Sequence, residues 1–365
     1  MKVLHVINTI EAGGAERLVA ELAIQNHKLG VDTYVYILKK TKINFFLDTF
    51  LSNNVNYTFS KRNSFYDVRH IFDIAKFIRN NKIDIIHAHL SFSLYYVALA
   101  KYLFFLPVKL ITTEHSTNNN RRKLIVFKLL DTFIYKRYDL IIAITEDTKI
   151  KLNNWVNATK FNSVTIINGI NIKNFQNSVP IALRDELKLT PDKKLLLNVG
   201  RFREAKNQKL LFESLTYLPE EYILVLIGTG SLLDEYKQYV NDLLISDRVF
   251  FLGAKSNVEQ YYKSSDLFIL PSKWEGFGLV AVEAMAAGIP ILVSNVPGLS
   301  DVVGNGGFLF ESENVHDLVQ KILFINNNPE EVKKRKYAAS LRVMDFSIET
   351  MAEKYLEQYN HILSR

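Results

Sequence analysis

Residues 266–298 read DLFILPSKWEGFGLVAVEAMAAGIPILVSNVPG, in which two short apolar runs flank a glycine loop and a helical segment. A succession of strand, loop, helix and strand is the repeating unit of a parallel α/β sheet. Two carboxylates, Glu275 and Glu283, lie in the loop and near the start of the helix. The stretch therefore predicts a parallel sheet with a polar loop at the carboxyl end of one strand.

The same alternation of apolar strands and amphipathic helices runs through both halves of the chain. Candidate strands occupy residues 2–8, 32–38, 83–89, 108–115, 139–145 and 163–169, and then 195–201, 222–230, 248–254, 266–272, 289–295 and 307–310. This pattern predicts an α/β protein of two Rossmann-like, doubly wound domains that face each other across a cleft.

The domain boundary is predicted from a change in pattern. Residues 171–194 are polar, contain proline and show no apolar period, so they are the best linker candidate. We expect a first domain at 1–172 and a second at 173–346. The helical segment 347–365 follows the second set of strands, and we expect it to pack back onto the first domain.

The composition limits the available chemistry. The chain has 365 residues, 48% hydrophobic and 23% charged, which is typical of a folded protein of two domains. It has no cysteine, which excludes disulfides, cysteine-ligated zinc, iron–sulfur clusters and thiol nucleophiles. The amino terminus lacks a signal-peptide pattern, and the most apolar stretch, 93–111, is interrupted by Lys101 and Pro107. We expect a cytoplasmic protein without a membrane span.

The positive charge is concentrated in the first half. Residues 1–172 hold 23 Lys and Arg against 13 Asp and Glu, a balance of +10, whereas residues 173–365 hold 22 against 25, a balance of −3. Basic and aromatic residues also interleave in 121–139, which reads as a helix with a cationic, solvated side. Basic surfaces of this kind meet anionic membranes, phosphates or nucleic acid; an ordinary spread of solvated lysines is the alternative.

The loop and helix start in 266–298 suit an anion. The N–H groups of Gly276, Phe277, Gly278 and Leu279 lie at the positive end of the predicted helix, with Glu283 one turn further on. Phosphate on these amides and ribose hydroxyls on Glu283 would fit a nucleotide. Two solvated acids beside an ordinary turn are the alternative reading.

Two cations follow the first strand of the second half. Arg201 and Lys206 lie in NVGRFREAKN (198–207), at the carboxyl end of a strand, where open α/β sheets bind ligands. They could hold a diphosphate and neutralise its charge as it leaves. Such pairs are also common in surface salt bridges.

Glycine loops and histidines supply further candidates. Gly13 and Gly14 end the first strand and would let a ligand approach the backbone, but neither this loop nor GTGSLL (228–233) has the full dinucleotide-binding spacing. His115 follows a buried strand and is either structural or cleft-facing. His87 and His89 have strand spacing, but no third ligand follows nearby, so we expect no metal.

Motifs of other enzyme classes are absent from the sequence. It contains no G-x-x-x-x-G-K-[ST], G-x-S-x-G or H-E-x-x-H, and no Asp-x-Asp of the kind that carries a divalent cation on a nucleotide. The sequence therefore lacks the main evidence that would indicate a kinase, a serine hydrolase or a metalloprotease.

Together these segments resemble the retaining glycosyltransferases of GT-B fold known as family four. The resemblance covers nearly the whole chain and rests on the order of GGAERL (13–18), TTEHS (112–116), IINGI (166–170), VGRFREAKN (199–207), FFLGA (250–254) and residues 266–298. It implies a metal-independent transfer of a hexose or N-acetylhexosamine from a nucleotide sugar, with UDP as the expected nucleotide.

The resemblance also implies residue roles. The groups nearest the reaction are His115, Arg201, Lys206 and Glu275. The donor-binding set is Gly13, Gly14, Arg201, Lys206, Glu275, Gly276, Phe277, Gly278, Leu279 and Glu283. In it the two cations hold the diphosphate, Glu283 holds the ribose, Glu275 lies beside the sugar, and the Gly13–Gly14 loop closes over the diphosphate.

The acceptor follows from the same resemblance together with the charge split. We expect a lipid-diphosphate-linked or polysaccharide acceptor, as in capsule, O-antigen or exopolysaccharide synthesis. We also expect peripheral contact with an anionic membrane, at the inner face of the bacterial plasma membrane, and no nucleic-acid partner. A nucleotide-sugar epimerase of the same fold, and a non-catalytic glycan- or lipid-binding protein, are the alternatives.

Overall fold

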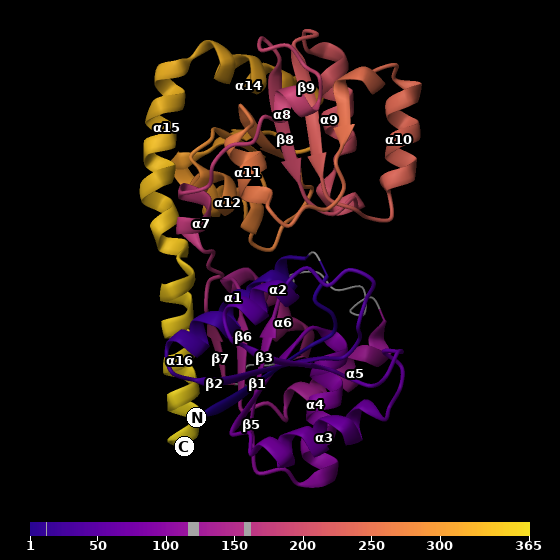
Figure 1. Cartoon of the computed structure of the whole chain (residues 1–365), viewed down its shortest axis with the longest axis vertical. Coiled ribbons are helices and arrows are strands. Elements are labelled where there is room, and N and C mark those ends of the chain that lie inside the picture. The colour runs from indigo at the N-terminus through magenta and orange to yellow at the C-terminus, as the bar shows by residue number, and fades with distance from the viewer. Residues whose placement is uncertain (12, 116–123, 157–161) are drawn as a thin grey trace. The chain divides into compact units, whose positions relative to one another are not determined.

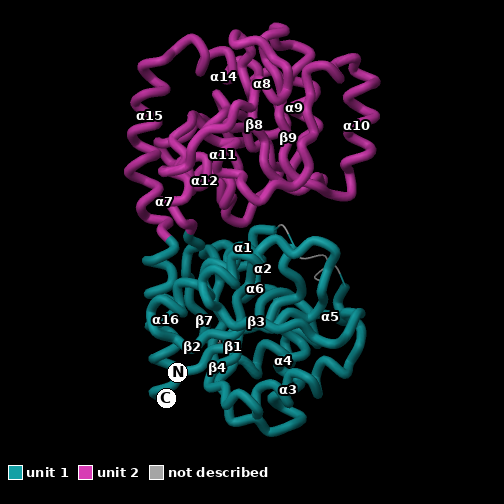
Figure 2. Tube along the Cα trace, viewed as in Figure 1, with its two compact units in different colours: residues 1–169, 348–365 teal, residues 170–347 magenta. Residues whose placement is uncertain are grey.

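The structure is a computed structural model that describes residues 1–11, 13–115, 124–156 and 162–365 (Figure 1). The chain forms two compact units, residues 1–169 with 348–365 and residues 170–347 (Figure 2). The first boundary therefore lies three residues before the one that the sequence pattern indicated.

The first unit is built on a seven-stranded parallel sheet of order β3-β2-β1-β4-β5-β6-β7. Its strands are β1 (Lys2–Ile7), β2 (Asp32–Ile37), β3 (Asn56–Phe59), β4 (Ile85–His89), β5 (Lys109–Glu114), β6 (Leu140–Ala143) and β7 (Ser163–Thr165). The strand order reverses between β1 and β4, which is the switch point where such sheets bind ligands at their carboxyl ends. The sequence analysis missed β3, because NYTF is a short edge strand that has no fully buried residue.

Helices cover both faces of this sheet (Figure 1). They are α1 (Gly14–Lys28), α2 (Leu47–Ser52), α3 (His70–Asn81), α4 (Ser91–Phe104), α5 (Ile125–Tyr135), α6 (Glu146–Val156) and α16 (Ile348–Leu363). The carboxyl-terminal helix α16 packs beside α1, and its Met351, Tyr355 and Tyr359 share a buried cluster with Leu18 and Leu22 of α1.

The second unit repeats the plan with a six-stranded parallel sheet of order β10-β9-β8-β11-β12-β13. Its strands are β8 (Lys194–Val199), β9 (Tyr222–Ile227), β10 (Val249–Phe251), β11 (Leu267–Leu270), β12 (Ile291–Ser294) and β13 (Phe308–Phe310). Here the order reverses between β8 and β11. The predicted α/β class, with one doubly wound parallel sheet in each half of the chain, is confirmed.

The helices of the second unit correct the linker prediction. They are α7 (Ile172–Gln176), α8 (Leu183–Glu186), α9 (Lys209–Tyr217), α10 (Leu233–Asp242), α11 (Val258–Lys263), α12 (Leu279–Ala287), α13 (Ser300–Val303), α14 (Val315–Asn327) and α15 (Pro329–Arg342). Phe175 in α7 is fully buried against the ring of Tyr262, and Leu183 in α8 is buried as well. Residues 171–194 are thus part of the second unit, because single buried anchors hold them without a repeating apolar period.

The sequence analysis expected no membrane span, and the most apolar stretch, 93–111, begins in α4. None of the helices in the described ranges is long and apolar enough to cross a membrane. The apolar stretch 93–111 divides into α4 and β5, which the connection through Phe105 and Pro107 separates.

Candidate active site

The carboxyl edge of the second sheet is formed by interlocked loops. The loop after β8 is tied to the loop after β9 by main-chain hydrogen bonds from Gly200 N to Ile227 O (2.9 Å) and from Phe202 N to Thr229 O (3.0 Å). A further hydrogen bond, from Lys273 N to Ala205 O (2.9 Å), joins the loop after β8 to the loop after β11. The switch point of this sheet is therefore a preorganised surface.

The glycine of GTGSLL allows this interlocking. Gly228 has φ +144°, and a Cβ there would lie 1.9 Å from the carbonyl oxygen of Gly200. Only a residue without a side chain lets the two loops approach so closely. The glycines that could have indicated dinucleotide binding are thus explained by the packing of the two loops.

Arg201 and Lys206 both lie on this edge and are half-buried. Gln208, which is fully buried, donates from Nε2 to the carbonyl oxygen of Arg201 at 3.2 Å and so fixes the main chain there. Lys206 Nζ forms an ion pair with Glu275 Oε2, and Ser272 Oγ donates to the same carboxylate oxygen at 3.4 Å. The Lys206 and Glu275 side chains are 21% and 17% exposed, so a ligand in solvent can reach the pair.

Glycines shape the loop around Glu275. Gly278 is the N-terminal cap of α12 with φ +76°, and a Cβ on it would lie 2.3 Å from Leu299 Cδ2. At Gly298, with φ +87°, a Cβ would lie 2.6 Å from the carbonyl oxygen of Glu275. These close approaches place the main chain of residues 275–278 against the start of α12. The first helical hydrogen bond there runs from Ala281 N to Gly278 O (2.8 Å), so the N–H groups of Leu279 and Val280 precede the helical ladder.

Phe277 and Leu279 are the two residues of this segment that carry apolar side chains. Phe277 is buried and packs edge-on against Phe346, with ring centroids 5.4 Å apart. Its side chain therefore anchors the loop, and only its amide is available to a ligand. Leu279 begins α12, as the sequence analysis expected.

Glu283 lies one turn into α12 and is 3% exposed. Tyr262 of α11 places its hydroxyl 3.0 Å from Glu283 Oε2, which supports the carboxylate in a buried position. Sequence reasoning did not find Tyr262, because a tyrosine in a short helix of mixed composition carries no motif.

The candidates in the first unit lie at the carboxyl edge of its own sheet. Gly13 caps α1 and Gly14 is its first residue, while residue 12 of the same loop lies outside the described residues. Gly13 has φ −165°, an extended conformation open to any residue, so glycine is not required there by the backbone. His115 follows β5 and is partly exposed, with Nε2 3.1 Å from His89 Nδ1.

The histidine pair in β4 has a neighbour that the sequence analysis missed. We expected no third metal-ligand candidate near His87 and His89, but β1 pairs with β4 so that His5 lies opposite His87. Nitrogens of these three buried histidines lie within 4.8 Å of one another. The expectation that no third candidate lies near His87 and His89 was wrong, because β1 and β4 are distant in sequence but adjacent in the sheet.

These three histidines are nevertheless engaged with protein partners. His87 contacts the Tyr359 hydroxyl at 2.8 Å and Thr113 Oγ1 at 2.7 Å. His5 contacts His89 at 3.1 Å, and His89 in turn contacts His115. The trio is therefore part of a hydrogen-bonded network, and a metal would have to displace these bonds.

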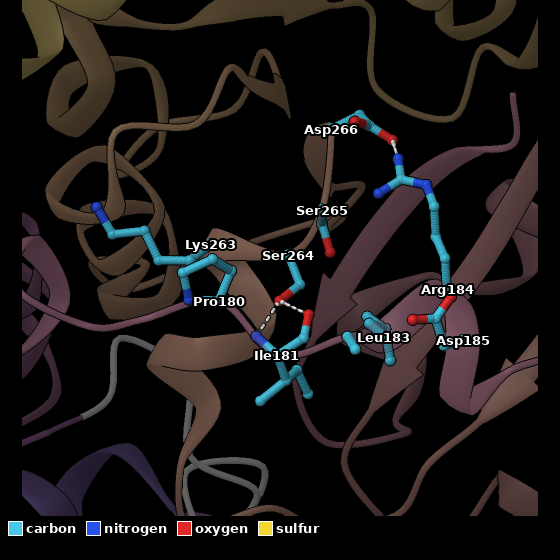
Figure 3. A pocket seen from close by; sticks show the side chains of 10 residues that line it. Pro180, Ile181, Leu183, Arg184, Asp185, Lys263, Ser264, Ser265 and Asp266 are labelled. Atoms are coloured by element: carbon cyan, nitrogen blue, oxygen red, sulfur yellow. Dashed lines mark hydrogen bonds and ion pairs between the residues drawn. The ribbon is translucent and has the colours of Figure 1, made fainter. Parts of the chain in front are cut away.

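A surface pocket in the second unit lies away from these residues (Figure 3). Ser264 Oγ bonds both to the N–H (2.9 Å) and to the carbonyl (3.0 Å) of Ile181, and Arg184 pairs with Asp266 at 2.5 Å. Asp266 also accepts a hydrogen bond from Leu195 N at the start of β8. The pocket thus lies at the amino ends of β8 and β11, where its polar groups fasten residues 180–185 to the sheet.

Comparison with known proteins accounts for the shared plan of the two units. The family model "Glycosyltransferase Family 4" matches residues 12–174, and "Glycosyl transferases group 1" matches residues 181–342. The chain is a family-four glycosyltransferase of GT-B fold. The two matches divide the glycosyltransferase close to the boundary between its compact units.

Two relatives of this glycosyltransferase are named for transfer to sugars that are linked to diphosphoundecaprenol. It is 28% identical over 72% of its length to a UDP-Gal:alpha-D-GlcNAc-diphosphoundecaprenol alpha-1,3-galactosyltransferase of Escherichia coli, of which 71% is covered. It is 28% identical over 84% of its length to an N,N'-diacetylbacillosaminyl-diphospho-undecaprenol alpha-1,3-N-acetylgalactosaminyltransferase of Campylobacter jejuni, of which 85% is covered.

A solved structure resembles the fold of this glycosyltransferase over its whole length. HepE of Anabaena, in complex with UDP-glucose, matches with a TM-score of 0.85 and 19% identity, covering 99% of this chain and all of that one. At this identity the likeness concerns the fold.

Proposed function

We propose that this glycosyltransferase moves a hexose or N-acetylhexosamine from a UDP-sugar to a lipid-diphosphate-linked or cell-surface glycan, with retention of configuration and without a metal. The observation that carries the proposal is the gathering of Arg201, Lys206, Glu275 and the start of α12 at one sheet edge. A nucleotide diphosphate needs cations and amide donors in such a position.

The diphosphate is held by protein groups in this proposal. Arg201 and Lys206 supply two positive charges at the carboxyl end of β8, and the first-turn N–H groups of α12 supply donors. Together they do the electrostatic work that a divalent cation does in other sugar transferases. The name of the Escherichia coli relative, which includes UDP-Gal, supports uracil as the base of the donor nucleotide.

The reaction needs little from a protein base. The bond between the anomeric carbon and the diphosphate oxygen breaks, a bond to the acceptor oxygen forms on the same face, and the hydroxyl proton passes to the departing diphosphate. The protein positions both substrates and stabilises the charge on the leaving group. The alpha linkages in the names of both relatives are the products expected when an α-linked donor reacts with retention.

Glu275 acts beside the donor sugar in this mechanism and does not attack it. Its carboxylate is paired with Lys206 and accepts a hydrogen bond from Ser272, both of which draw electron density away from a nucleophilic oxygen. We assign to Glu275 the orientation of sugar hydroxyls, and to His115 and the Gly13–Gly14 loop the contacts to donor sugar and diphosphate from the first unit.

Membrane contact is assigned to α5 of the first unit. The sequence analysis expected a cationic, solvated side in 121–139, of which residues 121–123 lie outside the described residues. Within α5 itself the exposed face is largely apolar. That face, with the preceding Leu124, comprises Leu124, Ile125, Val126, Leu129, Leu130 and Phe133, all at least 43% exposed.

The opposite face of α5 is fastened to the protein. Asp131 is fully buried and accepts hydrogen bonds from Tyr95 (2.5 Å) and Trp155 (2.8 Å). A fixed helix with an exposed apolar face, on a unit that holds 25 Lys and Arg against 16 Asp and Glu, matches an interfacial helix on an anionic bilayer. A lipid-linked acceptor, as in the names of both relatives, would be met at the same surface.

Removing two exposed apolar side chains from α5 is expected to weaken this contact. The double variant Ile125→Ser with Leu129→Ser should bind vesicles containing anionic lipid at least about 10-fold more weakly in co-sedimentation, because each side chain loses roughly 1.5–3 kcal/mol of apolar burial. Leu341→Ser is the control, since Leu341 is an exposed helical leucine of the second unit. Equal binding of the double variant and the wild type would refute the assignment.

Glu283 is expected to contact the ribose of the donor. Glu283→Gln should raise the Kd of UDP about 10-fold, because an ionised acceptor for ribose hydroxyls is lost, and should leave the Kd of 2′,3′-dideoxy-UDP unchanged in calorimetry. Tyr262→Phe is the control that keeps the carboxylate while removing its buried partner. An equal loss of affinity for both nucleotides would show that Glu283 acts on the fold and not on the ribose.

The whole proposal is tested by supplying a panel of UDP- and GDP-sugars, first alone and then with undecaprenyl-diphosphate-linked acceptors. Transfer of sugar to the lipid, with an alpha linkage and in the presence of a metal chelator, is the expected result. Conversion of a donor to its epimer without acceptor would identify an epimerase. Failure to consume any donor would indicate a non-catalytic glycan- or lipid-binding protein.

A further inference from the structure

A buried asparagine and two buried histidines connect the interior of the first unit to His115. Asn26 Nδ2 of α1 lies 3.1 Å from His5 Nε2, His5 Nδ1 lies 3.1 Å from His89 Nε2, and His89 Nδ1 lies 3.1 Å from His115 Nε2. Asn26, His5 and His89 have no exposed surface, whereas His115 is partly exposed. The chain therefore begins in the core and ends at the carboxyl edge of the sheet.

Burial keeps these imidazoles neutral. It lowers the pKa of His5 to about 3 and that of His115 to about 4, and it lowers the pKa of His89 well below the usual value. At neutral pH each ring thus carries a single N–H, on Nδ1 or on Nε2. Because each bond needs one donor and one acceptor, His5, His89 and His115 must either all carry the proton on Nδ1 or all carry it on Nε2.

Asn26 decides between these two protonation patterns. Asn26 Nδ2 lies against His5. Asn26 also forms a hydrogen bond with Tyr359: burial raises the pKa of the Tyr359 phenol well above normal, and the bond from Asn26 lowers it, as a donor to the phenol oxygen does. Among the described residues, Asn26 Oδ1 has no hydrogen-bond partner. Turning the amide over would leave the two-donor NH2 group without a partner in the core, which is the more costly arrangement.

With Asn26 as the donor, every proton in the chain is determined. His5 accepts at Nε2 and donates from Nδ1, His89 accepts at Nε2 and donates from Nδ1, and His115 accepts at Nε2. The branch through Tyr359 agrees, because its hydroxyl can then donate to His87 Nδ1, 2.8 Å away, and His87 Nε2 can donate to Thr113.

We propose that Asn26, acting through His5 and His89, holds His115 as the Nδ1-protonated tautomer, so that His115 offers an N–H donor at its second nitrogen. Resting on the proposed function, this N–H donates to an oxygen of the sugar donor. Asn26, His5 and His89 are positioning residues, which act only through His115.

The tautomer can be measured without any substrate. In two-bond proton–nitrogen correlation spectra of the ¹⁵N-histidine-labelled protein, assigned with His115→Gln, His115 should show protonated Nδ1 and bare Nε2. In Asn26→Asp a carboxylate can only accept from His5, so the chain should reverse and His115 should become Nε2-protonated. His70, which bonds to Ser60 and to the Ser64 carbonyl, lies outside the chain and should not change.

A second variant covers the case in which a buried carboxylate prevents folding. His89→Leu cuts the chain without burying a charge, and His115 should then show both tautomers. Nε2-protonated His115 in the wild type, or Nδ1-protonated His115 alone in every variant that folds, would overturn the proposal.

Activity separates this proposal from the proposed function. Asn26→Asp should lower kcat about 10- to 100-fold in the wild type and not at all in a His115→Ala background, because its effect passes through His115. A reversed tautomer with unchanged kcat would overturn the donor contact of His115. If no UDP-sugar is used by the wild type, the proposed function fails while the tautomer result stands by itself.

Discussion

Lys206→Met is expected to lower kcat/KM for sugar transfer by about 10²- to 10³-fold. The variant keeps the length of the side chain and removes the charge that, in the proposed mechanism, stabilises the departing diphosphate. Lys206 is held on the carboxyl edge of the second sheet by Glu275, in a pair that solvent reaches. The effect should fall mainly on kcat, because charge on the diphosphate grows as the bond to the sugar breaks. Steady-state kinetics with the donor identified in the panel would measure it.

Lys209→Met is the matched control. Lys209 is on the next helix of the same unit, is 52% exposed, forms a loose 4.0 Å pair with Glu213, and lies 4.5 Å from the centre of the Tyr239 ring. It should retain activity within about twofold, because exposed pairs of this kind contribute little. Glu275→Gln tests the partner: it should leave the UDP affinity near normal while lowering transfer. Normal turnover in Lys206→Met would remove the lysine from the mechanism and leave the diphosphate to other groups.

Gly228→Ala is expected to be the most destabilising single substitution at the site, with a loss of about 3 kcal/mol or more in the free energy of unfolding. Its Cβ would meet the Gly200 carbonyl oxygen at 1.9 Å, and φ +144° is a conformation that alanine rarely adopts. The loops after β8 and β9 must separate, which also displaces Arg201. Urea-induced unfolding and UDP titration should both register the change.

Gly288→Ala provides the control for backbone strain without collision. Gly288 ends α12 with φ +74°, and no atom lies within 4 Å of an added Cβ. It should cost about 1 kcal/mol and leave UDP affinity unchanged. A Gly228→Ala protein as stable as Gly288→Ala would mean that the loops can move apart freely and that the edge is not preorganised.

Local patterns were sufficient for much of the fold and for the donor-site candidates. Apolar runs of four to six residues between amphipathic helices predicted both sheets, because each strand buried on two faces must be apolar along its whole length. The glycines around Glu275 were also informative, since positive φ at Gly278 and close approach at Gly298 permit no side chain. A short edge strand such as β3 and the isolated anchors Phe175 and Leu183 left no such pattern.

Sequence spacing by itself determined the two α/β repeats, the absence of thiol chemistry, and the positions of Arg201, Lys206 and Glu275 in loops that follow strands, because these follow from residue type and period. Only the tertiary structure decided what depends on neighbours distant in the chain. The pairing of β1 with β4 and β5 with β4 brings His5 and His115 to His89, and the packing of α5 turns its apolar face outward. Parallel strands are joined by crossovers of many residues, so no local pattern records which side chains become neighbours.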